Sequence, residues 1–422
     1  MQNLNISFLN KYHGVSIHTH ITRVFLFFTL ITVSIFNCLY SPSQQPFPFS
    51  SEQNNQQGGK TGTGIIYSVN IGQQTCNPSI CPGQNFPACL LWLGFDRLSV
   101  KVPQEFSSAY SLTSIQTHDR LTITDTSNTV RWFIFRKDFS PRGEIQCPEW
   151  STDPDYLVCL TGTKTKPYSG YAIRLSDKKS LKLLDSCLEE FSTPHLWITS
   201  DTLHQFSSPD SASYNQYGIV DVNSLRSFFG TNRIVFTYTL PLKDGSIHYI
   251  DFAASPVPVT LPKPEGKETW TCHGPMISPD GNWVAYHCYL IAAQGMQYAS
   301  YMQRLSPGSK PVLIAEEASD PHWWVDTYNN NNYYIIYSFT PGSYFIDADA
   351  ATLDNNMMAG ATLKKKLTGT WQNNVPSHVQ SLSPDNSAAP DTLAKFPFKG
   401  GMSPDGRFLG TAYKYAYILK LE

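Results

Sequence analysis

The densest group of chemically capable side chains lies at Asp320-Pro321-His322-Trp323-Trp324. A carboxylate can act as a general base, an imidazole can move protons, and an indole ring can stack on a ligand. In an extended strand the two neighbouring tryptophans point to opposite faces, so at most one contacts a given ligand. We therefore take Asp320 as the catalytic candidate and His322, Trp323 and Trp324 as ligand-binding candidates.

The Asp-Pro pair is followed by Tyr333-Tyr334-Ile335-Ile336-Tyr337-Ser338. This combination resembles the strand opening of five-bladed furanosidase-type glycoside hydrolases, in which the Asp is the general base and a distant Glu is the general acid. The resemblance implies Asp320 as the base. Glu149, Glu265 and Glu268 are possible acids, but none lies in a segment that matches the acid motif of that family. The alternative is that Asp320 caps a turn and that one of the two tryptophans fills the core.

Other catalytic signatures are missing from the sequence. It has no Gly-x-Ser-x-Gly nucleophile motif. Gly58-Gly59-Lys60-Thr61 lacks the upstream glycine and strand of a phosphate-binding loop. No cysteine or histidine spacing suggests zinc, and His273, His287 and His322 are too scattered to define a metal site. We predict no cofactor and no metal.

The elements that must position these residues are indicated by an internal repeat. Ser278-Pro279-Asp280-Gly281 and Ser403-Pro404-Asp405-Gly406 stand in matching surroundings, Gly274–Tyr286 and Gly400–Ala412, and Pro148–Cys159 is a degenerate copy. Each copy predicts a strand, a tight turn and a second strand, because Pro presets the first corner and Gly accepts positive φ.

Ser-Pro-Asp-Gly followed by an aromatic and small apolar residues resembles the TolB-type, WD-like propeller repeat. The resemblance implies an all-β protein: a β-propeller of four-stranded antiparallel blades, six to seven in number. Weaker blade candidates are Arg233–Leu261, Asp320–Leu367 and Arg131–Lys137. Gly64–Asn70 predicts an orphan strand that completes the last blade. Short helices are possible at Leu181–Phe191 and Val222–Phe229, and residues 368–395 predict a long loop.

The chain has nine cysteines. Cross-strand partners in a hairpin have a nearly constant sum of residue numbers, and the turns at 152–155 and 279–282 bring two cysteine pairs opposite each other. We therefore predict disulfides Cys147–Cys159 and Cys272–Cys288. The pairing of Cys76, Cys81, Cys89 and Cys187 stays open.

The N-terminal region predicts export. An uncharged apolar stretch, Val24–Phe36, is too short to span a bilayer and fits the core of a signal peptide. Cys38 follows it, and this arrangement resembles a bacterial lipoprotein signal, so we predict lipidation of Cys38; cleavage and secretion is the alternative. The predicted organisation is a signal peptide at 1–38, a disordered linker at 39–63 and a propeller at 64–422. The expected location is the cell envelope or the extracellular space.

The formal net charge of -2 and the lack of a basic run argue against nucleic-acid binding. Membrane contact is expected only through the N-terminal lipid or signal. Our first hypothesis is a non-enzymatic propeller that presents loops for protein or glycan binding. The alternatives are a glycoside hydrolase that uses Asp320, and a periplasmic component of an envelope assembly.

Overall fold

The structure is a computed structural model of the 422-residue chain. It describes residues 62–69, 75–94, 100–110, 118–141, 143–199, 217–230, 233–252, 255–293, 295–326, 332–339, 342–347, 365–366, 398–413 and 415–421. The predicted signal peptide, Cys38, nearly all of the linker and the loop at 368–395 lie outside these residues.

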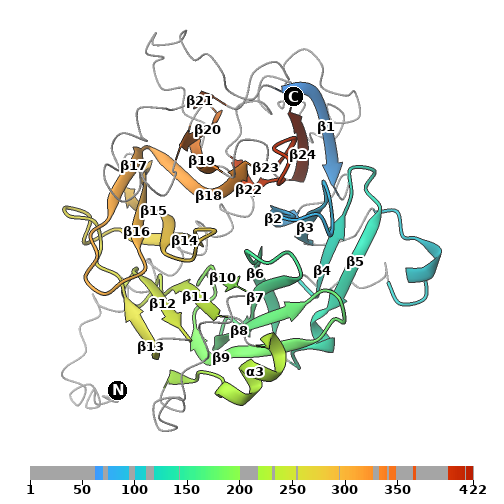
Figure 1. The fold of residues 1–422 in the computed structure, drawn as a ribbon, viewed down its shortest axis with the longest axis horizontal. Coiled ribbons are helices and arrows are strands. Elements are labelled where there is room, and N and C mark those ends of the chain that lie inside the picture. The colour runs from blue at the N-terminus through green and yellow to red at the C-terminus, as the bar shows by residue number, and fades with distance from the viewer. Residues whose placement is uncertain are drawn as a thin grey trace, which may run out of the picture.

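Six four-stranded antiparallel sheets follow one another around a central channel (Figure 1). Sheet 1 contains β2(Thr75–Ile80), β3(Leu90–Gly94), β4(Arg120–Thr124) and β5(Val130–Phe135); sheet 2 contains β6(Glu144–Trp150), β7(Tyr156–Thr163), β8(Lys166–Arg174) and β9(Ser180–Leu188). Sheet 3 contains β10(His195–Thr199), β11(Arg233–Thr239), β12(Ile247–Asp251) and β13(Ser255–Thr260); sheet 4 contains β14(Thr271–Ile277), β15(Trp283–Ala292), β16(Gly295–Arg304) and β17(Val312–Glu316).

Sheet 5 contains β18(Ala318–Asp326), β19(Asn332–Phe339), β20(Gly342–Asp347) and the two-residue β21(Lys365–Lys366); sheet 6 contains β22(Phe398–Met402), β23(Phe408–Tyr413), β24(Tyr415–Leu421) and β1(Gly62–Val69). The prediction of an all-β propeller with four-stranded antiparallel blades is confirmed. Its blade count is not: five sheets have four strands of five or more residues each, so the complete blades number five rather than six to seven. In sheet 5 the outermost strand is the two-residue β21.

The ring is closed by strands from the two ends of the described chain. β1 pairs with β24 in antiparallel register, with Tyr67 opposite Ile418 and Val69 opposite Ala416. This confirms the prediction that the orphan strand Gly64–Asn70 completes the last blade. The pairing covers an edge of β24 that would otherwise present unsatisfied backbone groups.

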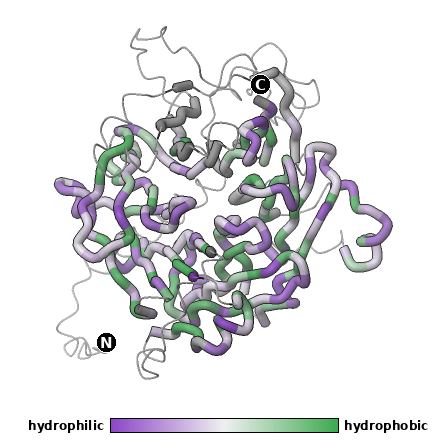
Figure 2. The backbone as a smooth tube through the Cα atoms, in the orientation of Figure 1, coloured by the Kyte–Doolittle hydropathy of each residue, from purple (hydrophilic) through white to green (hydrophobic). Residues whose placement is uncertain are grey.

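The core lies between neighbouring sheets. Strand residues alternate between the two faces, and apolar side chains from adjacent sheets pack together, such as Leu157 of sheet 2 with Leu91 of sheet 1. Figure 2 shows the apolar stretches running along the strands. The sheets are therefore held side by side by hydrophobic contact, and their innermost strands face the channel.

Helix α3(Val222–Phe229) matches the expected short helix, and Asp221 caps it by accepting a hydrogen bond from the Ser224 amide. A second short helix considered at Leu181–Phe191 is not formed. That segment contains most of β9, whose Leu183, Leu184 and Leu188 are buried in the core between sheets 2 and 3. Tertiary packing overrides the helical spacing here.

Of the two predicted disulfides, one is present. Cys272 and Cys288 lie opposite each other in β14 and β15 and are bonded. No disulfide joins Cys147 to Cys159, and both side chains are buried. The hairpin register shifts between Gln146 and Glu149, which places Cys147 in a β-bulge. Its side chain packs between sheets 2 and 3, whereas that of Cys159 packs between sheets 1 and 2.

Candidate functional site

The innermost strands share a bulge that the sequence repeats did not reveal. In β2, β6, β14 and β18 the register shifts at a residue pair that ends in proline: Pro78, Pro148, Pro275 and Pro321. Proline lacks an amide hydrogen, so it occupies a position that has no ladder partner without losing a hydrogen bond. In β10 the register is regular, but Pro194 likewise precedes His195. The proline bulge therefore recurs in four of the innermost strands.

The residues that follow these four bulges, together with one residue each from β10 and β22, line one cavity at the centre of the channel. These residues are Ser79, Glu149, His195, Met276 and His322, with Gly401 from sheet 6. The cavity volume is about 170 Å³, and Trp150, Trp323 and Trp324 also line it. Trp323 and Trp324 therefore both border one site, contrary to the expectation that at most one of them would. The innermost strands of all six sheets thus contribute residues to one cavity, some of them polar and some apolar.

The Ser-Pro-Asp-Gly turns lie next to the same cavity. Ser278 and Ser403 each donate to the following aspartate side chain and accept from the backbone of Trp283 or Phe408. Their prolines, Pro279 and Pro404, line the cavity, as do Thr152 and Pro82 at matching positions in sheets 2 and 1. Turn residues from four sheets therefore border one end of the cavity.

Glu149 is held from sheets 1 and 2. The Ser79 hydroxyl donates a hydrogen bond to the Glu149 carboxylate, and the backbone amide of Trp150 donates to the same oxygen at 3.0 Å. The Trp150 indole donates to the Ser79 carbonyl at 2.8 Å. Since Oε1 carries both of these bonds, Oε2 is the oxygen that faces the channel.

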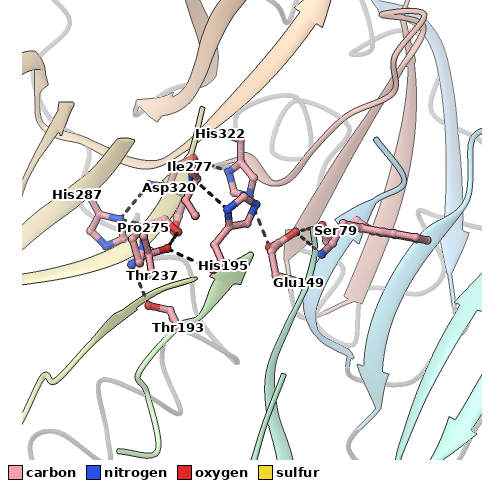
Figure 3. A network of polar contacts seen from close by, with 12 residues as sticks. Ser79, Glu149, Thr193, His195, Thr237, Pro275, Ile277, His287, Asp320 and His322 are labelled. Carbon is pink, nitrogen blue, oxygen red and sulfur yellow. Dashed lines mark hydrogen bonds and ion pairs between the residues drawn. The ribbon is translucent and has the colours of Figure 1, made fainter. Parts of the chain in front are cut away.

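His322 meets Glu149 from the opposite side of the channel, as Figure 3 shows. Its Nε2 lies 3.8 Å from Glu149 Oε2, and its Nδ1 donates to the Asp320 carbonyl at 3.1 Å. Burial lowers the pKa of His322, but the nearby Glu149 carboxylate, aided by Asp320, raises it above the ordinary value. The pair therefore favours an imidazolium facing a carboxylate.

His195 is the neutral histidine of the site. Its Nδ1 accepts a hydrogen bond from the Ile277 amide at 3.0 Å, which places the imidazole proton on Nε2. Burial lowers the pKa of His195 to about 4, against the opposing effect of Glu149. The ring is thus a fixed, uncharged donor beside a charged pair.

The predicted residues divide between the cavity and its surroundings. His322, Trp323 and Trp324 line the cavity, and the Trp323 indole donates to the Met276 carbonyl at 2.9 Å. Asp320 does not line it. It occupies the bulge with a φ of 51°, and its amide donates to His287 Nδ1 at 3.2 Å. The Asp-Pro pair is therefore one copy of the repeated bulge.

The three glutamates considered as possible acids lie in different places. Glu149 lines the cavity, whereas Glu265 and Glu268 are exposed on the connection between β13 and β14. Ser79, His195 and Met276 were missed by sequence reasoning. The signal that could have found them is the recurrence of proline one residue earlier, at Pro78, Pro194 and Pro275.

The described residues contain no cluster of three or more His, Cys, Asp or Glu side chains arranged to hold a metal ion. His273 and His287 lie side by side, with ring centroids 5.5 Å apart, and His287 is directed toward the backbone of Asp320. The arrangement at the cavity can donate and accept hydrogen bonds, and it can offer apolar ring surface.

Comparisons with known proteins leave the family undefined. No family model matches the chain, and no curated protein matches it. Among solved structures, a gluconolactonase from Xanthomonas campestris is 10% identical, covers 90% of this chain and 97% of its own, and has a TM-score of 0.43. TolB from Acinetobacter baumannii is 12% identical over 71% of this chain, with a TM-score of 0.36. An ancestral GH74 enzyme is 9% identical over 67% of this chain, with a TM-score of 0.37.

The match spans 59% of that TolB and 32% of the GH74 enzyme. Identities this low do not transfer an activity or a ligand from any of these proteins. Within the described residues, no helix combines the length and apolar character required to cross a membrane.

Proposed function

We propose that this chain is an exported β-propeller that binds a neutral, hydroxyl-rich ligand, a glycan, in its channel cavity. The observation that carries the proposal is the approach of Glu149 to His322 inside that cavity, with 15% and 13% of their side chains exposed. A carboxylate and an imidazolium together carry no net charge, and His195 is neutral. The site therefore offers hydrogen-bond acceptors and donors without attracting an ion.

The apolar lining fits the same class of ligand. Sugar rings present hydroxyl groups at their edges and C–H groups on their faces. Indole rings and a methionine side chain can cover the C–H faces, and Glu149, His195 and His322 can bond to hydroxyl groups. A protein ligand would have to place a neutral polar side chain in this small cavity. The cavity has no net charge that would favour a charged side chain of a protein partner.

Calorimetric titration with a panel of neutral mono- and oligosaccharides tests this function. We expect at least one sugar to bind the wild type. Glu149→Gln should weaken binding about tenfold, because a hydrogen bond to a charged group is replaced by a neutral one. Glu265→Gln is the matched control, since Glu265 is exposed outside the cavity. The proposal is wrong if no glycan binds, or if both variants bind like the wild type.

A second candidate function, glycoside hydrolysis, is favoured by one observation. Glu149, a possible acid partner of Asp320, lies in the cavity against His322, which bonds to the Asp320 carbonyl. Hydrolysis requires two carboxyl groups flanking the glycosidic bond. Among the described residues that line the cavity, Glu149 is the one carboxylate, so binding is preferred. Release of reducing sugar that both Asp320→Asn and Glu149→Gln abolish would establish the enzyme instead.

The proposed location depends on Cys38, which follows the apolar stretch Val24–Phe36. Labelling cells with a palmitate analogue should mark the wild type and leave Cys38→Ala unmarked. Equal labelling of the two proteins would exclude lipidation at this residue. Recovery of unlabelled wild type from the medium would support cleavage and secretion.

A further inference from the structure

Different segments of the chain line the two ends of the cavity. At one end lie the corners of the repeated turns, Pro82, Thr152, Pro279 and Pro404, from four different sheets. At the other end lie the residues that follow the bulges. Asp320, inside the bulge of β18, and Thr193, just before β10, do not line the cavity. The cavity therefore begins at the turns and stops at the level of the bulges.

The end of the cavity at the bulges is spanned by side chains from opposite sides of the ring. Sheet 2 carries Glu149 and sheet 5 carries His322, and these sheets lie three positions apart among six. Their side chains meet in the middle of the channel (Figure 3). A ligand that entered from the turns would meet this pair and could not continue past it.

The backbone around this floor is fixed on several sides. The His195 ring accepts from the Ile277 amide, and Thr193 accepts from the Gly274 amide at 3.0 Å, so sheets 3 and 4 are tied together. The Trp150 and Trp323 indoles likewise bond to carbonyl groups of neighbouring sheets. Opening the floor would require several of these contacts to break at once.

The size of the cavity limits what can fill it. Its volume of about 170 Å³ lies below the roughly 300–1,000 Å³ of pockets that enclose drug-sized ligands. One sugar ring is the largest unit that such a space can surround. An internal residue of a glycan would need two exits for the chain, and the floor removes one of them.

We propose that the cavity takes the terminal sugar of a glycan chain end-on, with the rest of the chain leaving between the repeated turns. This inference rests on the proposed function, since it specifies which part of a glycan is bound. It predicts discrimination between chains that have a free end and chains whose ends are blocked.

The test uses the wild-type protein and linear hexaoses of glucose, galactose and mannose. Each is titrated free, with a 4,6-benzylidene acetal on its non-reducing end, with 2-aminobenzamide on its reducing end, and with both. The methyl glycoside of each sugar is titrated alongside. We expect one of the two single blocks, and the double block, to weaken binding at least tenfold. The methyl glycoside should bind within about tenfold of the free hexaose.

Two failures can be told apart. If a free hexaose binds and its doubly blocked form binds equally well, recognition is internal and the end-on inference is overturned, while glycan binding stands. If neither methyl glycosides nor hexaoses bind, the proposed function itself fails.

Discussion

Glu149 and His322 come from sheets that face each other across the channel, and their side chains approach to 3.8 Å between Oε2 and Nε2. The contact joins residues 173 positions apart in the sequence, and no local pattern links them. It ties the second sheet to the fifth at the centre of the ring. A bond in this place acts on the stability of the ring as well as on any ligand in the cavity.

We expect Glu149→Gln to lower the free energy of unfolding by about 1–3 kcal/mol, because it leaves a mostly buried imidazolium without its carboxylate. The double variant Glu149→Gln/His322→Gln should recover part of this loss in a double-mutant cycle measured by denaturant unfolding. Glu265→Gln, on the exposed connection, should change the free energy by less than about 0.5 kcal/mol. Additive effects of the two cavity substitutions would show that the pair is not coupled.

The same pair predicts a pH dependence of stability. The pKa of His322 is raised in the folded protein, so its protonated form is favoured by folding. Its contribution is complete below the unfolded value of about 6.5 and is lost as the pH rises through the folded value. The difference in unfolding free energy between wild type and His322→Gln should therefore shrink as the pH rises above about 6.5.

His118 provides a control of opposite sign. Burial lowers its pKa to about 4, against the opposing effect of Glu144. Its contribution is present above the unfolded value and is lost as the pH falls toward 4. His118→Gln should thus leave the alkaline trend of the wild type in place. A His322→Gln difference that is constant over the alkaline range would refute the assigned protonation.

The cysteine pairs make a third prediction. Non-reducing peptide mapping should join Cys272 to Cys288 and leave Cys147 and Cys159 unjoined. Cys272→Ser should lower the free energy of unfolding by about 3 kcal/mol or less, in line with a disulfide loop of this length. Added reductant should lower the stability of Cys159→Ser and of the wild type by the same amount, because Cys159 is in no disulfide. Mapping that joined Cys147 to Cys159 would show that the bulge at Cys147 is misplaced.

The two cysteine pairs show which part of the hairpin geometry can be predicted from the sequence. The hairpin sums predict the register on both sides of the turn, and the observed pairs Gln146–Leu160 and Cys272–Cys288 obey them. A sum of residue numbers does not reveal which residue is bulged. Cys272 lies before the bulge in β14, but Cys147 lies inside the bulge in β6, where the side chain turns to the other face.

The candidate site could likewise be predicted only in part from the sequence. Local signals mark His322, Trp323 and Trp324, which line the cavity, and Ser-Pro-Asp-Gly marks the turns at its mouth. The same local motif marks Asp320, which lies in the bulge and not in the cavity lining, and its Asp-Pro is one copy of the bulge that recurs in other strands. Ser79, His195 and Met276 meet only when the ring closes, and ring closure is a long-range event that short motifs do not encode.

β1 closes the ring by pairing with β24. Deleting residues 62–69 removes β1, which pairs with β24 along most of its length. Each lost cross-strand pair costs about 0.2–1 kcal/mol, and the exposed edge of β24 gains unpaired backbone groups. Because sheet 6 contacts sheets 1 and 5, the loss should spread around the ring. We expect a single cooperative thermal transition at lower temperature, shifted by about 2–4 °C for each kcal/mol lost. Deleting residues 41–61, which form most of the predicted linker at 39–63, is the control and should leave the transition unchanged. A deletion of 62–69 that only frays one end, with the main transition intact, would mean that the ring does not depend on β1 for its closure.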